Sequence, residues 1–477
     1  MIAMGVIVAA AIVAQTGSPA PVGALPEPRQ LPWHEMRGYA FVHFGPNTFT
    51  DREWGQGDEP ESVFNPTALD AAQWVAAFKE AGFDGVILTA KHHDGFCLWP
   101  SAQSTHTVAS SPWREGKGDV LRELSSACAE AGLKFGVYLS PWDRNHPLYG
   151  TGEGYNEVFR SQLEEVLTGY GSTFEVWFDG ACGEGANGKR QVYDFPSFRQ
   201  VVRELQPGAV MFSDVGPDCR WVGNEQGHAG ETNWATLNVS GHGIGNDRPP
   251  AAASLRSGDR LGERWVPAEC DVSIRPGWFW HEAENGRVKS PRVLFDLFER
   301  SWGHNGSFLL NVPPDRRGLI HENDVAALRG FRELVDATYD HDLADGARVT
   351  VSASEASSSP ASCLVDGSTG ISTGDAYWMA PVGASEATIT IDWVDAVTLD
   401  RVQLREPIHL GQRIESVRVE ARVAGAYREI AKATTVGNRR VIRVEPVETD
   451  SLRITVGSTL GPPALRRIGV HRTPLAP

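Results

Sequence analysis

The hexapeptide Glu175-Val176-Trp177-Phe178-Asp179-Gly180 decides the predicted fold. Its strand-forming residues end on a carboxylate and a glycine, and the following Ala181-Cys182-Gly183 cannot continue a strand. An aspartate in this position often does no more than cap the next turn. If the strand belongs to a (β/α) barrel, however, Asp179 lies at its C-terminal tip, where barrel enzymes carry their catalytic groups.

Other apolar runs have the same design. The runs at 41–44, 86–94 and 135–140 end in His43, in Lys91-His92-His93-Asp94 and in Ser140. Amphipathic helices are predicted at 68–79, 119–131, 158–167, 197–205 and 324–336, with further strands at 209–212 and 307–312 and an irregular stretch over 216–290. Such alternation over about 300 residues predicts a TIM-like (β/α) barrel, because no Gly-rich phosphate loop after the first strand supports a doubly wound sheet.

The composition changes near residue 345. Beyond it, short alternating runs separated by Gly, Pro, Asp and Ser predict an all-β sandwich. Its loop at 364–369 and the later Tyr377-Trp378 resemble the discoidin or carbohydrate-binding class. We therefore expect an export segment at 1–24, a catalytic barrel at 25–345 and a β-sandwich at 346–477.

Composition narrows the class of partner. Lys+Arg 44 against Asp+Glu 60 gives a net charge of −16, which argues against a nucleic-acid partner and suits a small neutral substrate. Fifteen tryptophans suit a carbohydrate site, because pyranose rings present C–H faces that stack on indole. The six cysteines show no metal-binding spacing.

Residues 1–14 are uncharged and almost wholly apolar, and a Pro/Gly-rich piece follows them. This run is too short to span a bilayer, so no membrane association is expected, but it has the length of a signal-peptide core. Cleavage after Ala14 or Ala24 would fit, although the first charged residue is Glu27 and a basic n-region is missing. We expect export, to the periplasm or the medium.

Taken together, eight motifs resemble the α-L-fucosidases of glycoside hydrolase family 29, over roughly residues 35–345. They are His43-Phe44-Gly45, Trp54-Gly55, Lys91-His92-His93-Asp94-Gly95-Phe96, Ser140-Pro141-Trp142, Trp177-Phe178-Asp179-Gly180, Trp221-Val222-Gly223-Asn224-Glu225, Ser301-Trp302-Gly303 and Leu309-Leu310-Asn311-Val312. The combination of Trp-Phe-Asp-Gly with Gly-Asn-Glu looks like the branch that acts on α-1,3/1,4-linked fucose. The resemblance implies a retaining exo-α-L-fucosidase that forms a covalent fucosyl-enzyme, without a cofactor or metal, on fucosylated oligosaccharides or glycoconjugates.

Glycoside hydrolysis needs two carboxyl groups that flank the anomeric carbon. Asp179 is the first candidate, and the second must come from a loop that reaches over the site. Glu225 lies in such a loop, flanked by glycines and preceded by Trp221, whose bulk could keep the carboxyl protonated by desolvation. The family pattern gives Asp179 the role of nucleophile and Glu225 that of acid/base. Glu231, in the same loop, is the rival acid.

The resemblance also implies the residues around the sugar: His43, Glu53, Trp54, His92, His93 and Tyr138. Imidazoles suit sugar hydroxyls because they offer donors and acceptors. Two adjacent histidines suit a metal poorly, because neighbouring side chains of a strand point to opposite faces. Arg220 is a candidate for orienting a carboxylate, and Lys91 for an ion pair behind the site.

The insert between residues 213 and 285 adds Trp278, Trp280 and His281. Fucose is small, so these rings predict a platform for the neighbouring sugar, although tryptophans at a barrel rim can also serve packing alone. Two alternatives remain open at this level: a non-catalytic glycan-binding protein, and a metal-dependent barrel hydrolase. The oligomeric state cannot be read from these features.

Overall fold

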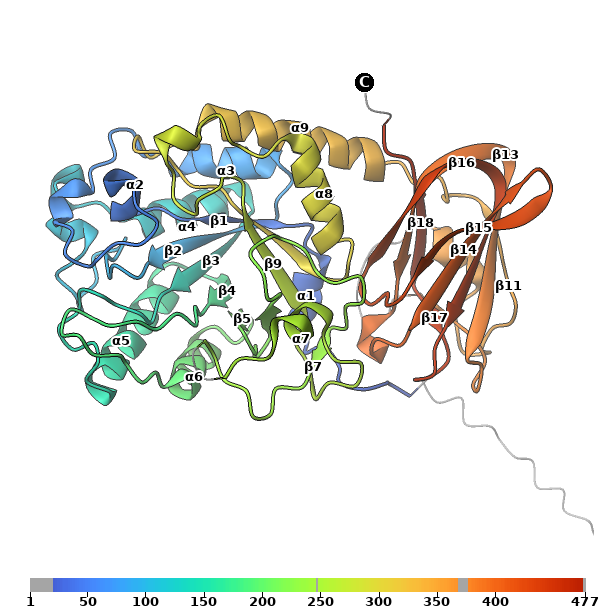
Figure 1. Ribbon diagram of the computed structural model, residues 1–477, viewed down its shortest axis with the longest axis horizontal. Coiled ribbons are helices and arrows are strands. Elements are labelled where there is room, and N and C mark those ends of the chain that lie inside the picture. The colour runs from blue at the N-terminus through green and yellow to red at the C-terminus, as the bar shows by residue number, and fades with distance from the viewer. Residues whose placement is uncertain (1–19, 246–247, 368–375, 475–477) are drawn as a thin grey trace, which may run out of the picture.

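Eight parallel strands close into a barrel in the computed structural model, which describes residues 20–245, 248–367 and 376–474 (Figure 1). The strand order around the barrel is β1-β10-β9-β6-β5-β4-β3-β2. The strands are β1 (Tyr39–Val42), β2 (Gly85–Lys91), β3 (Lys134–Leu139), β4 (Thr173–Trp177), β5 (Val210–Ser213), β6 (Cys219–Trp221), β9 (Ala268–Ser273) and β10 (Ser307–Asn311). The predicted TIM-like barrel is confirmed.

Two barrel strands, β6 and β9, lie in the stretch predicted to be irregular, and that prediction was wrong. β6 has three residues, and β9 (Ala-Glu-Cys-Asp-Val-Ser) has carboxylates within it, so neither shows an apolar run. Pairing defines them instead, since Arg220 aligns with Ala268 and Trp221 with Glu269 in a parallel ladder. The rest of the insert forms a small antiparallel pair, β7 (Thr236–Leu237) with β8 (Arg264–Trp265), and the short helix α7 (Ala252–Ser257).

Helices precede, separate or follow the strands, except that β5 leads into β6 through a short loop, and most of them cover the barrel from outside (Figure 1). They are α1 (Gln30–Glu35), α2 (Pro46–Thr50), α3 (Ala71–Glu80), α4 (Val120–Ala131), α5 (Glu153–Gly169), α6 (Phe195–Leu205), α8 (Pro291–Ser301) and α9 (Glu322–Tyr339). Asp70 and Asp119 cap α3 and α4 by accepting backbone N–H groups of the first turn, which sets where these helices begin. Gly132, in the left-handed conformation, ends α4.

The C-terminal part is built of antiparallel β-sheets, as predicted. Its six-stranded sheet has the order β11-β13-β16-β14-β15, with β18 paired to β13, and β12 pairs with β17 separately. These strands are β11 (Arg348–Val351), β12 (Trp378–Met379), β13 (Glu386–Arg405), β14 (Ser416–Val423), β15 (Ala426–Ala433), β16 (Arg440–Gly457), β17 (Ala464–Leu465) and β18 (Arg467–His471). Trp378 is fully buried in this domain's core.

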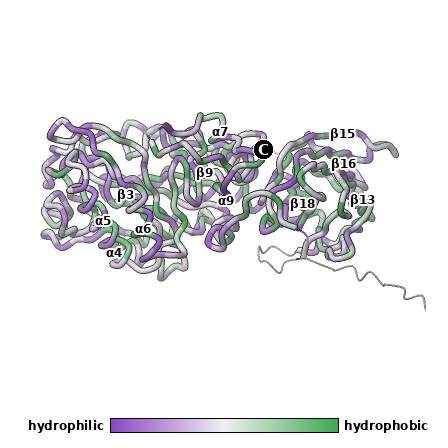
Figure 2. Tube along the Cα trace, turned by 90° about the horizontal axis from the view of Figure 1, so that it is seen from below, coloured by the Kyte–Doolittle hydropathy of each residue, from purple (hydrophilic) through white to green (hydrophobic). Residues whose placement is uncertain are grey.

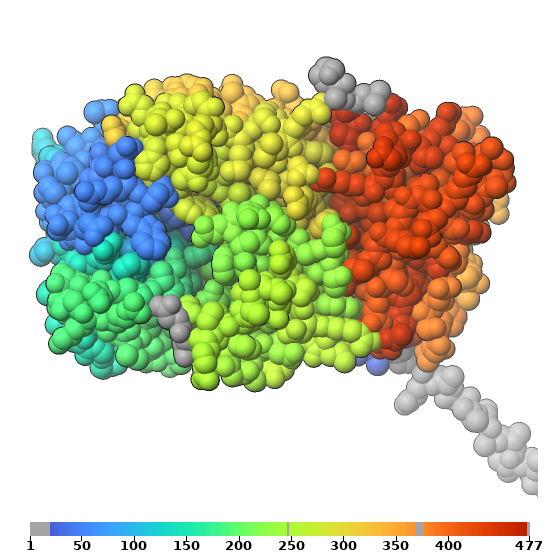
Figure 3. Space-filling view, in the orientation of Figure 1, coloured from blue at the N-terminus to red at the C-terminus, as the bar shows by residue number. Residues whose placement is uncertain are grey.

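The two domains lie end to end along the long axis of the molecule (Figures 1 and 2). The β-sheet domain rests on the barrel segments coloured green and yellow in Figure 3. Hydrogen bonds join them, among them Val441 N to Gly303 O at 2.7 Å and Asn233 N to Thr435 Oγ1 at 2.8 Å. The domains therefore share an ordered junction.

Several predictions concern residues beyond those described. Residues 1–19 of the expected export segment, and residues 368 and 369 of the discoidin-like loop, lie outside the described ranges. Within those ranges, no helix has the length and hydropathy needed to cross a membrane. None of the six cysteines, all of them described, forms a disulfide.

Candidate active site

One pocket at the C-terminal ends of the barrel strands collects nearly every residue that the sequence singled out. It encloses a cavity of about 190 Å³. Its lining consists of aromatic rings, three histidines and four carboxyl groups: Phe41, His43, Glu53, Trp54, His92, His93, Tyr138, Trp177, Asp179, Ala181, Glu225, Asp271 and Trp278. Of the predicted site residues, only Arg220 is missing from this lining.

Asp179 lies two residues beyond β4 and is held at both oxygens. Its Oδ1 accepts the backbone N–H of Ala181 at 2.7 Å, so the aspartate does cap the turn. Its Oδ2 accepts the hydroxyl hydrogen of Tyr138 at 2.9 Å and lies 3.7 Å from Nε2 of His93. Its side chain is 25 % exposed, so Asp179 both caps the turn and remains accessible from the cavity.

Glu225 reaches the pocket from the loop after β6. Trp278 donates its indole N–H to Oε2 of Glu225 at 3.3 Å. Burial raises the pKa of this carboxyl, the N–H of Trp278 partly opposes the rise, and the charges of Asp179 and Glu53 add to it. The raised pKa makes Glu225 more prone than an ordinary glutamate to keep its proton, as a general acid must.

Glu231 lies elsewhere. Its side chain is 82 % exposed and pairs with Arg440 of the β-sheet domain at 2.6 Å. Partial burial raises its pKa, but His304 and Arg440 outweigh that effect, so the pKa is lowered and the carboxyl stays ionised. The geometry therefore favours Glu225 over Glu231 as the acid.

All three predicted histidines face the cavity. β2 ends at Lys91, so the alternation of a strand no longer separates His92 from His93, and their ring centroids lie 4.1 Å apart. Burial lowers the pKa of His43 to about 3 and that of His92 well below its usual value, and it also lowers the pKa of His93. Neutral imidazoles with one donor and one acceptor suit sugar hydroxyls.

Partners outside the cavity fix two of these rings. Nδ1 of His43 lies 2.8 Å from Oδ1 of Asn311, and Nδ1 of His93 lies 2.8 Å from Oγ of Ser140. Nδ1 of His92 is buried without a hydrogen-bond partner among the described residues.

Glu53 and Trp54 come from the loop after α2. Glu53 accepts the backbone N–H of Trp278 at 2.8 Å, and its other oxygen lies 2.6 Å from Nε2 of His281. Trp54 is 53 % exposed at the rim, with its ring edge-to-face to His93 at 5.5 Å. Glu53 therefore anchors the Trp278 loop, while Trp54 offers an open aromatic face.

The predicted role of Arg220 was wrong. Its side chain is completely buried and donates to the carbonyls of Leu255, Val266 and Trp234 and to Asn233 Oδ1. The guanidinium thus holds the insert together and touches no carboxylate. Because the three residues of β6 show no apolar run, the sequence does not indicate the outward direction of this side chain.

Lys91 forms the predicted ion pair behind the site. Its Nζ lies 3.1 Å from Oδ2 of Asp143 and donates to Tyr155 and Gln162, with both charged groups fully buried.

Asp271 is a site residue that sequence reasoning missed. It lies on β9, is 3 % exposed, and accepts the indole N–H of Trp221 at 3.0 Å. Burial raises its pKa well above the usual value, and the nearby charge of Glu225 adds to the rise. A carboxylate two residues after another carboxylate gives no strand signal, so only the recognition of β9 could have found it.

Trp280, predicted as part of a sugar platform, serves packing. It is buried and does not line the pocket, and the Arg316 guanidinium lies 5.7 Å from its ring centroid. Of the predicted platform, Trp278 remains at the cavity.

Among the described residues, Glu175, Cys219 and Glu269 are the group whose ligand atoms lie close enough to hold a metal ion, within 4.8 Å of one another. They lie inside the barrel, where Trp33 and Tyr39 already donate to the carboxylates.

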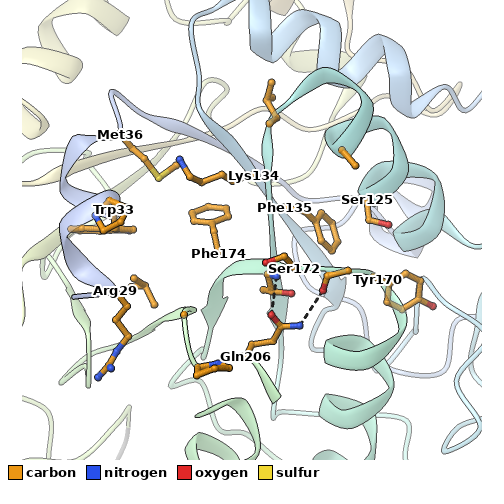
Figure 4. Close-up of a pocket in the computed structure, with 18 residues that line it drawn as sticks. Arg29, Trp33, Met36, Ser125, Lys134, Phe135, Tyr170, Ser172, Phe174 and Gln206 are labelled. Atoms are coloured by element: carbon orange, nitrogen blue, oxygen red, sulfur yellow. Dashed lines mark hydrogen bonds between the residues drawn. The ribbon is translucent and has the colours of Figure 1, made fainter. Parts of the chain in front are cut away.

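A larger cavity of about 760 Å³ opens where the barrel strands begin (Figure 4). It is lined by side chains such as Trp33, Met36, Phe135 and Phe174, and its lining contains no carboxylate and no histidine. The larger of these two cavities therefore lacks the acid and base groups that an active site needs, and the smaller pocket has them.

Comparison with known proteins agrees with the geometry. The family model for α-L-fucosidase matches residues 31–337. The chain belongs to the α-L-fucosidase family. The Arabidopsis thaliana protein "Alpha-L-fucosidase 1" is 45 % identical over 95 % of this chain and 88 % of its own length.

Solved α-L-fucosidase relatives share both domains. The structure named SpGH29 has a TM-score of 0.89 at 37 % identity and covers 96 % of this chain and 100 % of its own. A Ruminococcus gnavus glycoside hydrolase family 29 fucosidase in complex with fucose has a TM-score of 0.86 at 31 % identity and covers 97 % and 98 %. This α-L-fucosidase is thus a glycoside hydrolase whose substrates are fucosylated glycans, and the binding-only and metallohydrolase alternatives are set aside.

Proposed function

We propose that this enzyme is a retaining exo-α-L-fucosidase that releases terminal α-1,3/1,4-linked L-fucose. The observation that carries the proposal is that Asp179 and Glu225 line one pocket with different surroundings. Asp179 is fixed by two donors and exposed to the cavity, whereas Glu225 has a raised pKa. One ionised and one protonated carboxyl are what retaining hydrolysis requires.

In the first step, a carboxylate oxygen of Asp179 attacks the anomeric carbon while Glu225 protonates the glycosidic oxygen, and the C–O bond to the leaving sugar breaks. The products are a covalent fucosyl-enzyme and the free aglycone. In the second step, Glu225 takes a proton from water, which attacks the anomeric carbon and releases Asp179. The Tyr138 hydroxyl supports the returning carboxylate charge.

The three neutral histidines surround the space that the sugar ring would occupy. The fucose complex of the Ruminococcus gnavus relative supports fucose as the occupant. The cavity of about 190 Å³ is small, which suits removal of one terminal sugar at a time.

A second hollow of about 270 Å³ adjoins the pocket and supports the linkage assignment. The two linings share Trp177, Asp179, Ala181, Glu225 and Asp271, and the second adds Gly180, Phe212, Asp214, Trp221 and Gly245. A neighbouring sugar held there and against Trp278 would help to position the acid loop, so its binding energy would appear in kcat.

The stereochemistry of hydrolysis tests the mechanism. With Asp179 as nucleophile, the two carboxyl groups should be about 5 to 5.5 Å apart and the first product should be α-fucose. Time-resolved NMR of the released sugar distinguishes the anomers, and β-fucose as first product would refute the proposal. Asp179→Ala should abolish nearly all activity, and azide should restore part of it by filling the vacated volume.

A panel of defined glycans tests the linkage. A branched trisaccharide that carries fucose beside a galactose should be cleaved far faster than α-1,2-linked fucose. Equal kcat/KM values would leave a general fucosidase.

We also propose export to the periplasm or the medium, supported by the apolar run at residues 1–14. N-terminal sequencing of the mature protein from fractionated cells tests this, and a chain that starts at Met1 in the cytoplasmic fraction would contradict it.

A further inference from the structure

A polar cavity of about 490 Å³ lies at the junction between the barrel and the β-sheet domain. We call it the junction cavity. The barrel contributes the region after α1 and the ends of α8 and α9, and the β-sheet domain contributes β13, β18 and the turn before β16: Glu35, Arg37, Phe298, Trp302, Val335, Tyr339, Asp340, Asp342, Asp345, Gly367, Gln403, Arg405, Arg439, Arg467 and His471. No residue of this lining belongs to the catalytic pocket.

Arg439 is the unusual member of the junction cavity. It is 5 % exposed, and its Cζ atom lies over the ring of Trp302 at 3.8 Å from the centroid. Among the described residues, no carboxylate pairs with it and its buried Nε has no acceptor. A guanidinium stays charged in a protein, so this position holds a buried cation without a directly paired carboxylate, and the charge of Glu35 acts on it only from a distance.

The nearest carboxylate is already occupied. Oε1 of Glu35 accepts from Arg405 at 2.7 Å and from Arg466 at 2.8 Å. In the same lining, Arg467 binds Asp342 and Asp345, yet its Nη1 is buried without a partner among the described residues. Two buried guanidinium groups thus have N–H donors left unused.

The local field is positive. Burial and, to a smaller extent, the charges of Arg439, Arg405 and Arg466 together lower the pKa of His34 to about 3. Burial together with the charges of Arg466 and Arg467 lowers the pKa of Arg405 to about 9, although its pairing with Glu35 opposes the shift. The lining also holds four carboxylates, Glu35, Asp340, Asp342 and Asp345, but each is paired with an arginine other than Arg439. The positive charge of Arg439 is therefore the one left over in this partly enclosed space, which suits an anion.

We propose that the junction cavity binds a tetrahedral oxyanion, phosphate or sulfate, through Arg439 and Arg467, and that the anion stabilises the docking of the β-sheet domain on the barrel. Guanidinium groups match the oxygens of such anions through paired N–H donors. The same chemistry would hold a free anion or the ester group of a sugar phosphate, and the volume leaves room for either.

Arg439→Met tests the proposal, because it removes the charge and keeps an apolar chain against Trp302. Arg453→Met is the matched control: Arg453 also stacks on an aromatic ring, Tyr427 at 4.2 Å, but it is paired with Glu420 at 2.7 Å. Isothermal titration of the full-length enzyme with inorganic phosphate, sulfate and glucose 6-phosphate should give saturable binding. The affinity should fall roughly tenfold or more in Arg439→Met and stay unchanged in Arg453→Met.

Thermal unfolding provides a second readout that does not depend on a heat signal. Sulfate stabilises proteins in general by exclusion from their surface, and that effect is common to all three proteins. Relative to chloride at equal ionic strength, the parent and Arg453→Met should gain extra stability that Arg439→Met lacks. In chloride alone, Arg439→Met should be at least as stable as the parent, because a buried unpaired charge is gone.

Binding of glucose 6-phosphate but not of the inorganic anions would assign the site to a sugar ester, and the reverse order would assign it to a free anion. No saturable binding of any probe, or equal binding by the parent and Arg439→Met, would overturn the proposal. Hydrolysis of an aryl fucoside should be unaffected in both variants.

Discussion

Trp278 donates its indole hydrogen to Oε2 of Glu225 across 3.3 Å. The backbone N–H of the same tryptophan donates to Glu53 at 2.8 Å. The loop after β9 therefore fixes the acid carboxyl from one side, and Glu53 fixes the loop. Because this hydrogen bond favours ionised Glu225, the tryptophan both positions the acid and tunes its pKa.

Trp278→Phe should move the alkaline limb of the pH profile upward. Loss of the indole donor raises the pKa of Glu225, and the general acid works only while protonated, so activity should persist to higher pH. The measurement is kcat/KM against pH with a natural glycan. Trp54→Phe is the control: it removes a rim indole that binds no carboxylate among the described residues, so the alkaline limb should stay in place. A downward shift of this limb in Trp278→Phe would contradict the assignment of Glu225 as the general acid.

The roles of Glu225 and Glu231 can be separated by leaving group. Loss of a general acid costs roughly 10² to 10⁴ in rate when the leaving group needs protonation, and much less for an activated phenol. Glu225→Ala should therefore be severe on natural glycans and mild on an aryl fucoside. Glu231→Ala should affect both substrates little, since its partner is Arg440 at the domain junction; the opposite pattern would exchange the roles.

Trp278 and Trp280 should differ in their effect on linkage preference. Trp278→Ala should reduce the ratio of kcat/KM for the branched trisaccharide to that for an aryl fucoside. Trp280→Ala should keep this ratio and lower the melting temperature, because its ring is buried outside the pocket. An unchanged ratio in both variants would rule out a sugar platform at Trp278.

Asp271 should act in its neutral form. Its raised pKa makes the amide of Asp271→Asn a close substitute that still accepts the N–H of Trp221. Asp271→Ala leaves that buried donor unsatisfied, at a cost of about 1–3 kcal/mol in unfolding free energy. The free energy of unfolding in denaturant and kcat should both be similar in the parent and in Asp271→Asn, and lower in Asp271→Ala. If Asp271→Asn were as inactive as Asp271→Ala, the ionised carboxylate would be needed.

Lys91→Met should be strongly destabilising. It leaves Asp143 as an unpaired charge in a fully buried position, which costs about 3–5 kcal/mol. Lys117→Met breaks an exposed pair with Glu115, with side chains 78 % and 85 % exposed, and should change unfolding by less than about 1 kcal/mol. Unfolding in urea measures the change in unfolding free energy for both variants. Similar changes would show that the buried Lys91–Asp143 pair contributes little to stability.

The sequence by itself determined the barrel units whose strands are apolar runs and whose helices carry aspartate caps and glycine ends. It also placed Asp179, because a strand of Val, Trp and Phe that stops at Asp-Gly has a fixed direction and a fixed tip. The six runs recognised in this way put the histidines, Tyr138 and Asp179 at one end of the barrel. Local propensity and periodicity were sufficient for these features, since each is contained within a few residues.

Only the tertiary structure decided the features that depend on pairing between distant segments. Strands β6 and β9 have no apolar run and exist because barrel closure supplies their hydrogen-bond partners. The pairing of these two strands sets the direction of their side chains, so Arg220 points away from the site and Asp271 points into it. Trp278 and Trp280 lie two residues apart in a loop without periodicity, so the sequence does not distinguish them. In the structure Trp278 lines the pocket, whereas Trp280 is buried outside it. The unpaired charge of Arg439 likewise depends on a junction between domains, because burial there is created by chain segments far apart in the sequence.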